Sequence, residues 1–337
     1  MNSATILAIE TSCDETAAAV VRDGRECLGQ ALASQIDLHA RFGGVVPEIA
    51  SRSHQEVINP IIEEALERSG KSLADLDGIA VTQGPGLPGA LMVGMATAKA
   101  LSFGASKPLI GVNHIEGHMF ASFFDHPDLS PPFISLVVSG GHTLLVYVSD
   151  WGEYEVLGET LDDAAGEAFD KISSYLGLGY PGGPIIENLA KKGDPAAINF
   201  PRAMMKTRNY NFSLSGLKTS VLYYIAKKKS AHEEINLEDL AASFQEAVFD
   251  VQVSKTERAI REKNVDQLVL AGGVGANMRL RERLSEVVKT NGWRLYYPPL
   301  ALCTDNAIMI GAAAWFGYNR GAFLGLDAET KPNMTLN

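Results

Sequence analysis

Two histidines spaced one helical turn apart are the residues of this chain best suited to metal chemistry. His114 and His118 are separated by Ile115, Glu116 and Gly117. Both imidazoles leave the same helix face at this spacing and could share one transition-metal ion. The zinc-protease motif needs Glu directly after the first histidine, a place held here by Ile115. The spacing therefore predicts a metal site without the protease base; two histidines simply packed in a helix are the plainer alternative.

Acidic residues gather in a polar segment near the amino terminus. Glu10, Asp14 and Glu15 fall within six positions, between two apolar runs. Carboxylates so placed can hold a metal ion, a water, or a reacting hydroxyl or amine. An acidic solvated turn is the alternative interpretation.

Two glycine-containing segments could bind a nucleotide. Residues 139–143 read Ser-Gly-Gly-His-Thr, and successive amides in such a turn can form an anion nest that glycine lets a phosphate approach. A plain tight turn explains the same residues. Residues 272–277 follow an apolar run but fit neither the dinucleotide fingerprint nor the P-loop. Asn277 could still bind a base or a sugar there.

A third polar segment is dense in acids. Asp162, Asp163 and Glu167 are predicted to cap a helix or lie in its first turn. Asp170 lies one turn further on, where capping does not explain it, and its carboxylate could bind a ribose diol.

The sequence contains an internal repeat of predicted elements. Residues 5–22 and 133–148 each predict a β-hairpin, and residues 77–103 and 266–288 each predict a strand, a glycine-rich loop and a helix. This duplication implies an α/β fold of two similar lobes.

The predicted domains are residues 1–130 and 131–337, divided in the proline-rich stretch 125–132. An insertion of helical pattern spans about 151–236 of the second domain. Helices are predicted over 162–175, 183–192, 214–229 and 237–262, followed by a last, buried helix that starts near Thr304 as N-cap and packs back toward the first lobe.

The amino-acid composition limits the kinds of partner that this protein can bind through its overall charge. The 337 residues are 46% hydrophobic with a net charge of −11, so the overall field does not favour nucleic acid. The charge is uneven: residues 188–230 hold nine basic residues against one acid, and Arg279, Arg281 and Arg283 form a second cluster. These are either a patch for an anionic polymer or solvated helix faces. Three scattered cysteines, with no secretion signal and no membrane-spanning run, favour the cytoplasm.

Duplicated lobes with phosphate-type hairpins describe the actin-like ATPase architecture, and several motifs make a closer match. Together they resemble the bacterial tRNA N6-adenosine threonylcarbamoyltransferases. The motifs lie at Glu10–Thr16, Gly43–Glu48, His114–His118, Val138–Thr143, Asp162–Lys171, Tyr180–Pro184 and Thr304–Ala307.

The resemblance implies a role for particular residues. His114, His118 and Asp305 match the family's ligands to one transition-metal ion per subunit, iron or zinc. Asp14 and Glu15 match acids near the reacting group. The substrate contacts match Val137, Val138, Ser139, Gly140, Gly141, Asp170, Gly183 and Asn277.

The implied activity moves a threonylcarbamoyl group from threonylcarbamoyl-AMP to N6 of the adenosine beside the anticodon, in tRNAs that read ANN codons. The metal would orient the substrate, Mg²⁺ could accompany bound nucleotide, and TsaB and TsaE would be partners. A glycoprotease-type metalloprotease and a small-molecule kinase of actin-like fold are the alternatives. Magnesium prefers oxygen ligands, so a kinase of this fold has little use for the histidines.

Overall fold

The computed structural model describes residues 2–336, which form two compact units. The first unit contains the residues up to 129 and those from 298 onward, and the second contains residues 130–297. The chain thus returns to the first unit after residue 297, whereas the sequence-based boundaries placed all residues after 130 in the second domain. The reason is the last helix, whose apolar surface packs on strands of the first unit.

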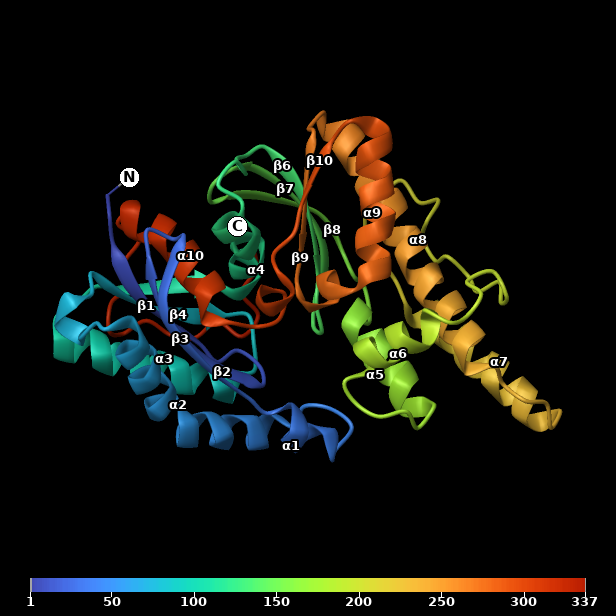
Figure 1. Ribbon diagram of the computed structural model, residues 1–337, viewed down its shortest axis with the longest axis horizontal. Helices are drawn as coiled ribbons and strands as arrows, with labels where there is room; N and C mark the ends of the chain where they lie inside the picture. Colours follow the sequence, from blue (N-terminus) through green and yellow to red (C-terminus); the bar gives the residue numbers. More distant parts are fainter. Residues whose placement is uncertain (1, 337) are drawn as a thin grey trace. The chain divides into compact units, whose positions relative to one another are not determined.

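The first unit is built on a five-stranded mixed sheet in the order β3-β2-β1-β4-β5 (Figure 1). Strands β1 and β2 form the predicted hairpin, β2 pairs antiparallel with β3, and β4 and β5 continue parallel to β1. The strands are β1 (Thr5–Glu10), β2 (Glu15–Arg22), β3 (Glu26–Ser34), β4 (Gly78–Gly84) and β5 (Leu109–Asn113).

Helices cover both faces of this sheet. On one face α2 and α3 pack over Leu7 and Ile9, and on the other the side chain of Ala8 lies against Gly311 of α10. This alternation follows from the two-residue period of β1. The helices are α1 (Ile36–Ala40), α2 (Pro47–Ser69), α3 (Pro88–Ala105), α4 (His114–Asp125) and α10 (Ala307–Asn319), with short 3₁₀ turns η1 (Leu73–Asp75) and η3 (Leu300–Leu302).

The second unit repeats the same sheet topology in the order β8-β7-β6-β9-β10, with the same sequence of antiparallel and parallel pairs. This repetition confirms the predicted duplication. The strands are β6 (Phe133–Val138), β7 (Thr143–Asp150), β8 (Glu153–Glu159), β9 (Gln267–Ala271) and β10 (Arg294–Tyr296). Strand β8 falls inside the stretch predicted to be a helical insertion.

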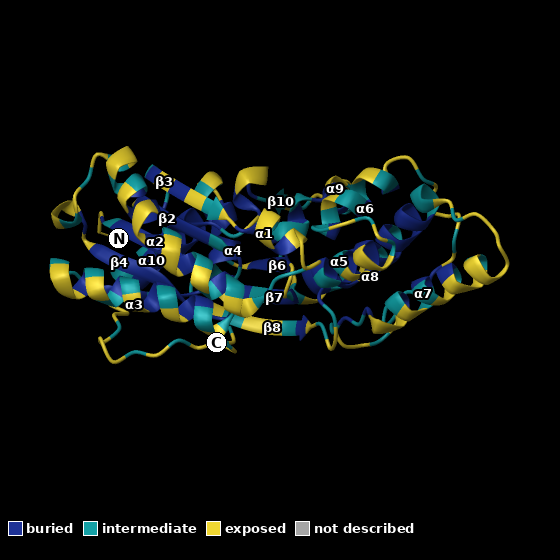
Figure 2. Cartoon of the chain, turned by 90° about the horizontal axis from the view of Figure 1, so that it is seen from below, coloured by how far each residue is buried: buried dark blue, intermediate teal, exposed yellow. Residues whose placement is uncertain are grey.

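One face of this second sheet packs against the long helix α8, much of which is buried (Figure 2). Its stripe of Leu240, Phe244, Val248 and Val251 is buried as predicted. The helices are α5 (Ala165–Tyr175), α6 (Gly182–Ala190), α7 (Ser215–Ser230), α8 (Leu237–Lys263) and α9 (Met278–Asn291), with the 3₁₀ turn η2 (Gly273–Ala276). Among residues 2–336, no helix combines the length and apolar composition needed to cross a membrane.

Two predicted helix starts differ from the structure. Helix α5 begins at Ala165, not near Asp162, and α10 begins at Ala307, not at Thr304. The N-cap of α10 is Asn306, whose side chain accepts the backbone N–H of Met309. Helix α10 itself is buried on nearly all sides, as its apolar sequence predicts.

Candidate functional site

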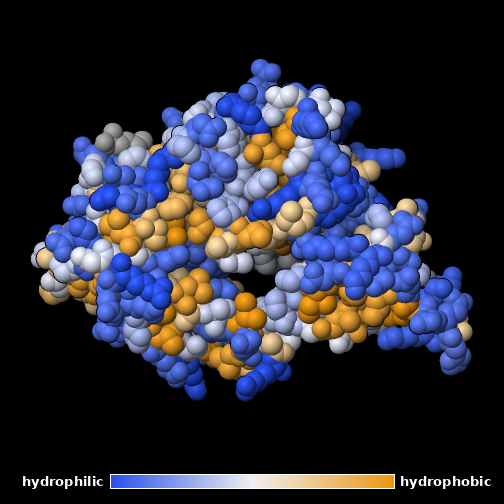
Figure 3. Space-filling model, viewed as in Figure 1, coloured by the Kyte–Doolittle hydropathy of each residue, from blue (hydrophilic) through white to orange (hydrophobic). Residues whose placement is uncertain are grey.

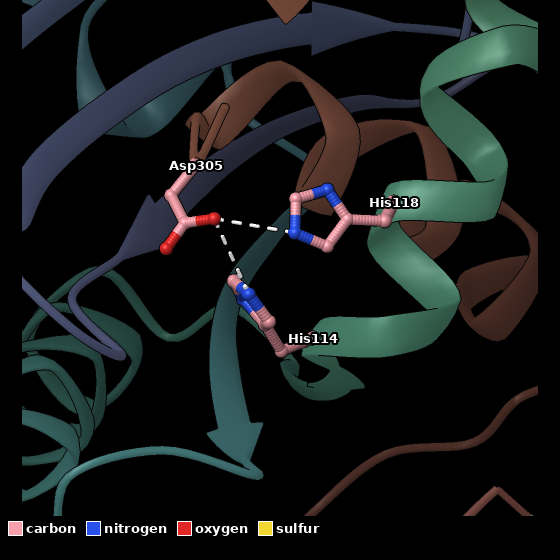
Figure 4. Close-up of side chains that lie close together, drawn as sticks. All are labelled: His114, His118 and Asp305. Carbon is pink, nitrogen blue, oxygen red and sulfur yellow. Dashed lines mark ion pairs between the residues drawn. The ribbon is translucent and has the colours of Figure 1, made fainter. Parts of the chain in front are cut away.

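Two helices of the first unit carry a cluster of metal-ligating side chains. His114 is the first residue of α4, and the Asn113 side chain caps that helix by accepting the N–H groups of Ile115 and Glu116. His118 follows one turn later on the same face. Asp305 lies just before the cap of α10, so its carboxylate is not needed to cap the helix. It points at both imidazoles (Figure 4).

The three side chains converge closely. The Asp305 Oδ1 atom lies 3.4 Å from His114 Nε2 and 3.2 Å from His118 Nε2. The three ligand atoms all lie within 4.8 Å of one another, and the two rings stand edge to face at 78°. Two imidazole nitrogens and one carboxylate oxygen are a donor set suited to iron or zinc.

A buried carboxylate orients His114 from behind. The Glu10 Oε2 atom lies 3.0 Å from His114 Nδ1, and the Ser12 Oγ atom lies 3.1 Å from the same nitrogen. Glu10 also accepts the Thr82 hydroxyl at 2.6 Å and the backbone N–H of Ser12. A carboxylate on one imidazole nitrogen fixes the ring and leaves the other nitrogen for a metal.

His118 supplies a further test of the metal site. Its side chain is 1% exposed, and within residues 2–336 neither ring nitrogen has a hydrogen-bond partner; Nε2 has only the ion-pair contact with Asp305. A buried polar atom without a partner is destabilising. A metal ion on Nε2 would remove part of that penalty, so the residues present fit a bound metal.

The opposite charges of the histidines and carboxylates in this cluster shift one another's pKa values toward the ionised forms. Burial alone would raise the pKa of Asp305, but His114 and His118 outweigh burial and hold that pKa far below its usual value. Burial likewise opposes protonation of His114, yet Asp305 and Glu10 raise the pKa of His114 well above its usual value. Opposite charges at these distances favour both ionised forms.

The predicted catalytic acids lie at the end of the turn between β1 and β2 of the same unit: Asp14 is the last residue of the turn and Glu15 is the first residue of β2. Backbone atoms hold this turn: the N–H of Gln35 donates to the Asp14 carbonyl at 3.0 Å, and His54 Nε2 lies 3.0 Å from the Cys13 carbonyl. Burial, then the charges of Asp305 and Asp14, raise the pKa of Glu15 to about 10. Glu15 is therefore protonated near neutral pH in the metal-free protein.

The surroundings of Cys13 in this turn do not favour the thiolate form. Burial, followed by the nearby charge of Asp14, raises the pKa of the Cys13 thiol well above its usual value. The thiolate is the reactive form of cysteine, so a neutral thiol here does not support covalent catalysis.

In the second unit, the Ser139–Thr143 turn leaves two amides open. Ser139 donates its N–H to the His142 carbonyl at 2.8 Å, whereas the exposed N–H groups of Gly140 and Gly141 have no protein partner within residues 2–336. A β-carbon on either glycine would meet nothing within 4 Å. The turn therefore has open space and free donors, as an anion nest requires.

Neighbouring elements are fixed against this turn. The N–H groups of Gly166 and Glu167 at the start of α5 donate to the carbonyls of Ser139 and Gly140 at 3.1 and 3.2 Å. Gly272 has φ +88°, and a β-carbon there would overlap the carbonyl of Val138. Only glycine fits that position without strain. The structure thus brings the Ser139 turn and the Gly272 loop together within the second unit.

Two of the other predicted substrate residues, Asp170 and Asn277, already form hydrogen bonds within the protein. Asp170 accepts the N–H of Gly182 at 2.7 Å. Asn277 caps α9 with its side-chain oxygen and donates its amide to Gln245 at 2.8 Å. Val137 and Val138 have fully buried side chains, whereas Gly183 has open space where a side chain would be.

The acidic segment before α5 corrects one prediction. Asp162 does not cap α5; it accepts the Ser213 hydroxyl at 2.6 Å and the N–H of Leu214 at 2.7 Å, close to the start of α7. Asp163 forms ion pairs with Lys171 and Lys218. Glu167 does lie in the first turn of α5.

The basic run 188–230 is largely neutralised by acids outside it. Five of its nine basic residues form ion pairs with such acids, which come from α6, from α8 and from the segments before α5 and between α7 and α8. The pairs are Lys191–Glu187, Lys192–Glu238, Arg202–Asp250, Lys218–Asp163 and Lys228–Glu233. In the second cluster, Arg279 and Arg283 both pair with Glu246.

The roles of three residues of the centre were not predicted from the sequence, although Glu10 was among the acids expected to hold a metal ion or a reacting group. Glu10 orients His114, Asn113 caps the helix that carries both histidines, and Asn306 caps α10 beside Asp305. The asparagines directly precede helices and could have been found as caps. Glu10 ends a strand, and only its position across the sheet from α4 gives it this role.

Comparison with solved structures supports the architecture. HypF of T. kodakarensis superposes with a TM-score of 0.66 at 15% identity, covering 96% of this chain and 49% of that protein. Component A of (R)-2-hydroxyglutaryl-CoA dehydratase from Acidaminococcus fermentans gives a TM-score of 0.57 at 16% identity, covering 94% of this chain and 99% of that one. Sequence identities this low establish the fold alone. The superpositions confirm the predicted α/β fold of two actin-like lobes.

Sequence comparison identifies the family. The TsaD family model, tRNA N6-adenosine threonylcarbamoyltransferase, matches residues 26–312. A protein of that name from Clostridium botulinum (strain 657 / Type Ba4) is 56% identical over 334 residues, covering 99% of this chain and 98% of its own. Another from Clostridioides difficile (strain 630) is 53% identical over the full length of both chains. The chain therefore belongs to the tRNA N6-adenosine threonylcarbamoyltransferase (TsaD) family and is a transferase.

Proposed function

We propose that this protein transfers the threonylcarbamoyl group of threonylcarbamoyl-AMP to N6 of the adenosine beside the anticodon in tRNAs that read ANN codons. The carbamoyl carbon gains a bond to N6, its bond to the phosphate oxygen breaks, and AMP leaves. The observation that carries the proposal is the convergence of His114, His118 and Asp305 in a chain of this family. We place the reaction in the cytoplasm.

His114, His118 and Asp305 would hold one iron or zinc ion, with Glu10 fixing the first imidazole. The ion, when bound, would orient the carbamoyl-phosphate group and act as a Lewis acid toward it. A protease role has no support from α4, because Glu116 is not in the place of the protease base.

Asp14 is the proposed acceptor of the proton that N6 loses. Its neighbour Glu15 holds its own proton near neutral pH in the metal-free protein and would serve as a hydrogen-bond donor beside it. A positioned carboxylate in this role typically contributes about 10²–10⁴-fold to the rate.

The second unit would bind the AMP half of the substrate. Gly140 and Gly141 offer their free amides to the phosphate, while Val137, Val138 and Ser139 set the course of the backbone. Asp170, Gly183 and Asn277 would line the nucleoside end. The amide group of Asn277 has one hydrogen left after its bond to Gln245, so any contact it makes is a single one. Mg²⁺ could accompany the nucleotide, and TsaB and TsaE are the expected partners.

The decisive test is nucleoside analysis of unmodified tRNA after incubation with this protein, threonylcarbamoyl-AMP and the partner proteins. Threonylcarbamoyladenosine should form with the intact protein and be lost with His118→Ala, while His232→Ala on the exposed surface should leave the yield unchanged. Modification that continues fully in His114→Ala and His118→Ala proteins stripped of metal would remove the centre from the reaction.

A further inference from the structure

The carboxyl-terminal segment returns to the first unit along residues 83–87, which are the end of β4 and the loop that follows it. The N–H of Lys331 donates to the Gln83 carbonyl at 2.8 Å, and the Gln83 side chain donates to the Glu329 carbonyl at 2.8 Å. The N–H of Gly86 donates to the Pro332 carbonyl at 3.1 Å. These three bonds fix residues 329–332 on the loop, and we call residues 329–335 the tail.

The same loop touches the metal centre on its other side. A β-carbon on Gly84 would overlap the carbonyl of Lys331, so the tail lies directly on the loop backbone. The N–H of Leu87 donates to the Ser12 carbonyl at 2.8 Å, and a β-carbon on Gly86 would come within 2.6 Å of that oxygen. Ser12 in turn places its hydroxyl 3.1 Å from His114 Nδ1.

A second connection reaches the same histidine through its helix. The Asn113 amide donates to the Thr335 carbonyl at 3.1 Å, while the Asn113 oxygen caps α4. Asn113 directly precedes His114, so the tail holds the residue that fixes the start of the ligand helix. Two separate routes therefore run from the tail to one imidazole.

We propose that the tail is a positioning element of the metal centre, which holds His114 in the orientation that a metal requires. This inference rests on the metal site of the proposed function. Groups that orient a ligand from outside the coordination sphere typically change metal affinity about 10–100-fold. The tail reaches His114 through the cap residue Asn113 and through Ser12 at the imidazole, so its loss should have an effect in this range.

The test compares zinc affinity of full-length protein and variants by competition with a chromophoric chelator. A chain ending at Ala328 should bind Zn²⁺ about 10–100-fold more weakly, whereas a chain ending at Thr335 retains every tail bond described above and should match the full length. Circular dichroism and the melting temperature show whether each chain folds.

A point variant keeps the test independent of truncation. Asn113→Asp retains a side-chain oxygen to cap α4 but replaces the amide that donates to Thr335, so it should weaken zinc binding without lowering helix content. Zinc affinity equal to that of the full-length protein in both Asn113→Asp and the chain ending at Ala328 would overturn the tail proposal, while loss of binding in His114→Ala would leave the metal site standing. Failure of the full-length protein to bind zinc or iron would overturn both.

Discussion

Gly117 of α4 faces Ile310 of α10 so closely that a β-carbon on Gly117 would lie 2.9 Å from Ile310 Cδ1. His118 is the next residue of α4, and Asp305 lies two residues before α10 begins. The rings of Phe120 and Phe316 pack 4.7 Å apart further along the same pair of helices. The spacing of these helices therefore sets the distance between two of the proposed ligands.

Gly117→Val should push the two helices apart and weaken zinc binding. Overpacking a close helix contact typically costs about 1–3 kcal/mol, so the melting temperature should also fall. Gly104→Val is the matched control, because Gly104 of α3 has nothing within 4 Å of a β-carbon. Unchanged zinc affinity in Gly117→Val would show that the helix spacing does not control the site.

Metal affinity should rise with pH. The pKa of His114 is raised well above its usual value because Asp305 and Glu10 outweigh burial, so in the metal-free protein the ring is protonated at neutral pH. A metal must displace that proton, and its affinity should increase about tenfold per pH unit until the pH passes this pKa. Calorimetric titration in buffers of different ionisation enthalpy should detect one released proton. A metal affinity that stays constant from about pH 6 to about pH 8 would contradict this.

Glu15→Gln should stabilise the metal-free protein at alkaline pH. The folded chain holds the Glu15 proton up to a pH of about 10, whereas the unfolded chain releases it above the usual value of 4.5. The folded state therefore binds more protons between these limits, and the free energy of unfolding falls as pH rises. The glutamine variant should be more stable at pH 8 by at least about 1 kcal/mol, or about 2–4 °C in melting temperature. The two proteins should converge below a pH of 4.5, where Glu15 is protonated in both states, and Glu63→Gln on the exposed side of α2 should show no such difference.

Asp14→Asn should separate chemistry from binding. If Asp14 accepts a proton in the reaction, single-turnover transfer to tRNA should fall about 10²–10⁴-fold. The affinity for a non-reactive adenylate analogue, measured by calorimetry, should stay nearly the same. An equal loss of analogue affinity and transfer would make Asp14 a ligand of the bound substrate and not a participant in the reaction.

Reversing the charge of Lys227 and Lys229 should weaken tRNA binding in the presence of the partner proteins. Both lysines are exposed near the end of α7, a region whose surface is hydrophilic (Figure 3). Lys229 lies 5.9 Å from the ring centre of Tyr175, itself 48% exposed. The salt dependence of binding should fall by about one unit of slope per lost phosphate contact. Lys289→Glu on α9 is the control, and equal weakening by that variant would show only a general effect of charge.

The sequence by itself determined the parts of this protein that depend on neighbouring residues. The hairpins follow from paired apolar, β-branched runs along β1, β2, β6 and β7 that flank a short polar or glycine-containing turn. The shared face of His114 and His118 follows from the helical period in the same way. Their approach to a third ligand could be predicted only through resemblance to a family, since no local pattern links α4 to Asp305.

Only the tertiary structure decided which distant groups meet. Glu10 at the end of β1 reaches His114 at the start of α4, although 104 positions separate them in the chain. Asp162 bonds residues near the start of α7 instead of its own helix. Ion pairs that the sequence does not show also offset much of the positive charge of residues 188–230. Asp163, Glu238 and Asp250 lie far in sequence from the lysine and arginine residues with which they pair. Ion pairs and hydrogen bonds act over a few ångströms of space, so a charge count along the chain does not measure the field that a partner meets.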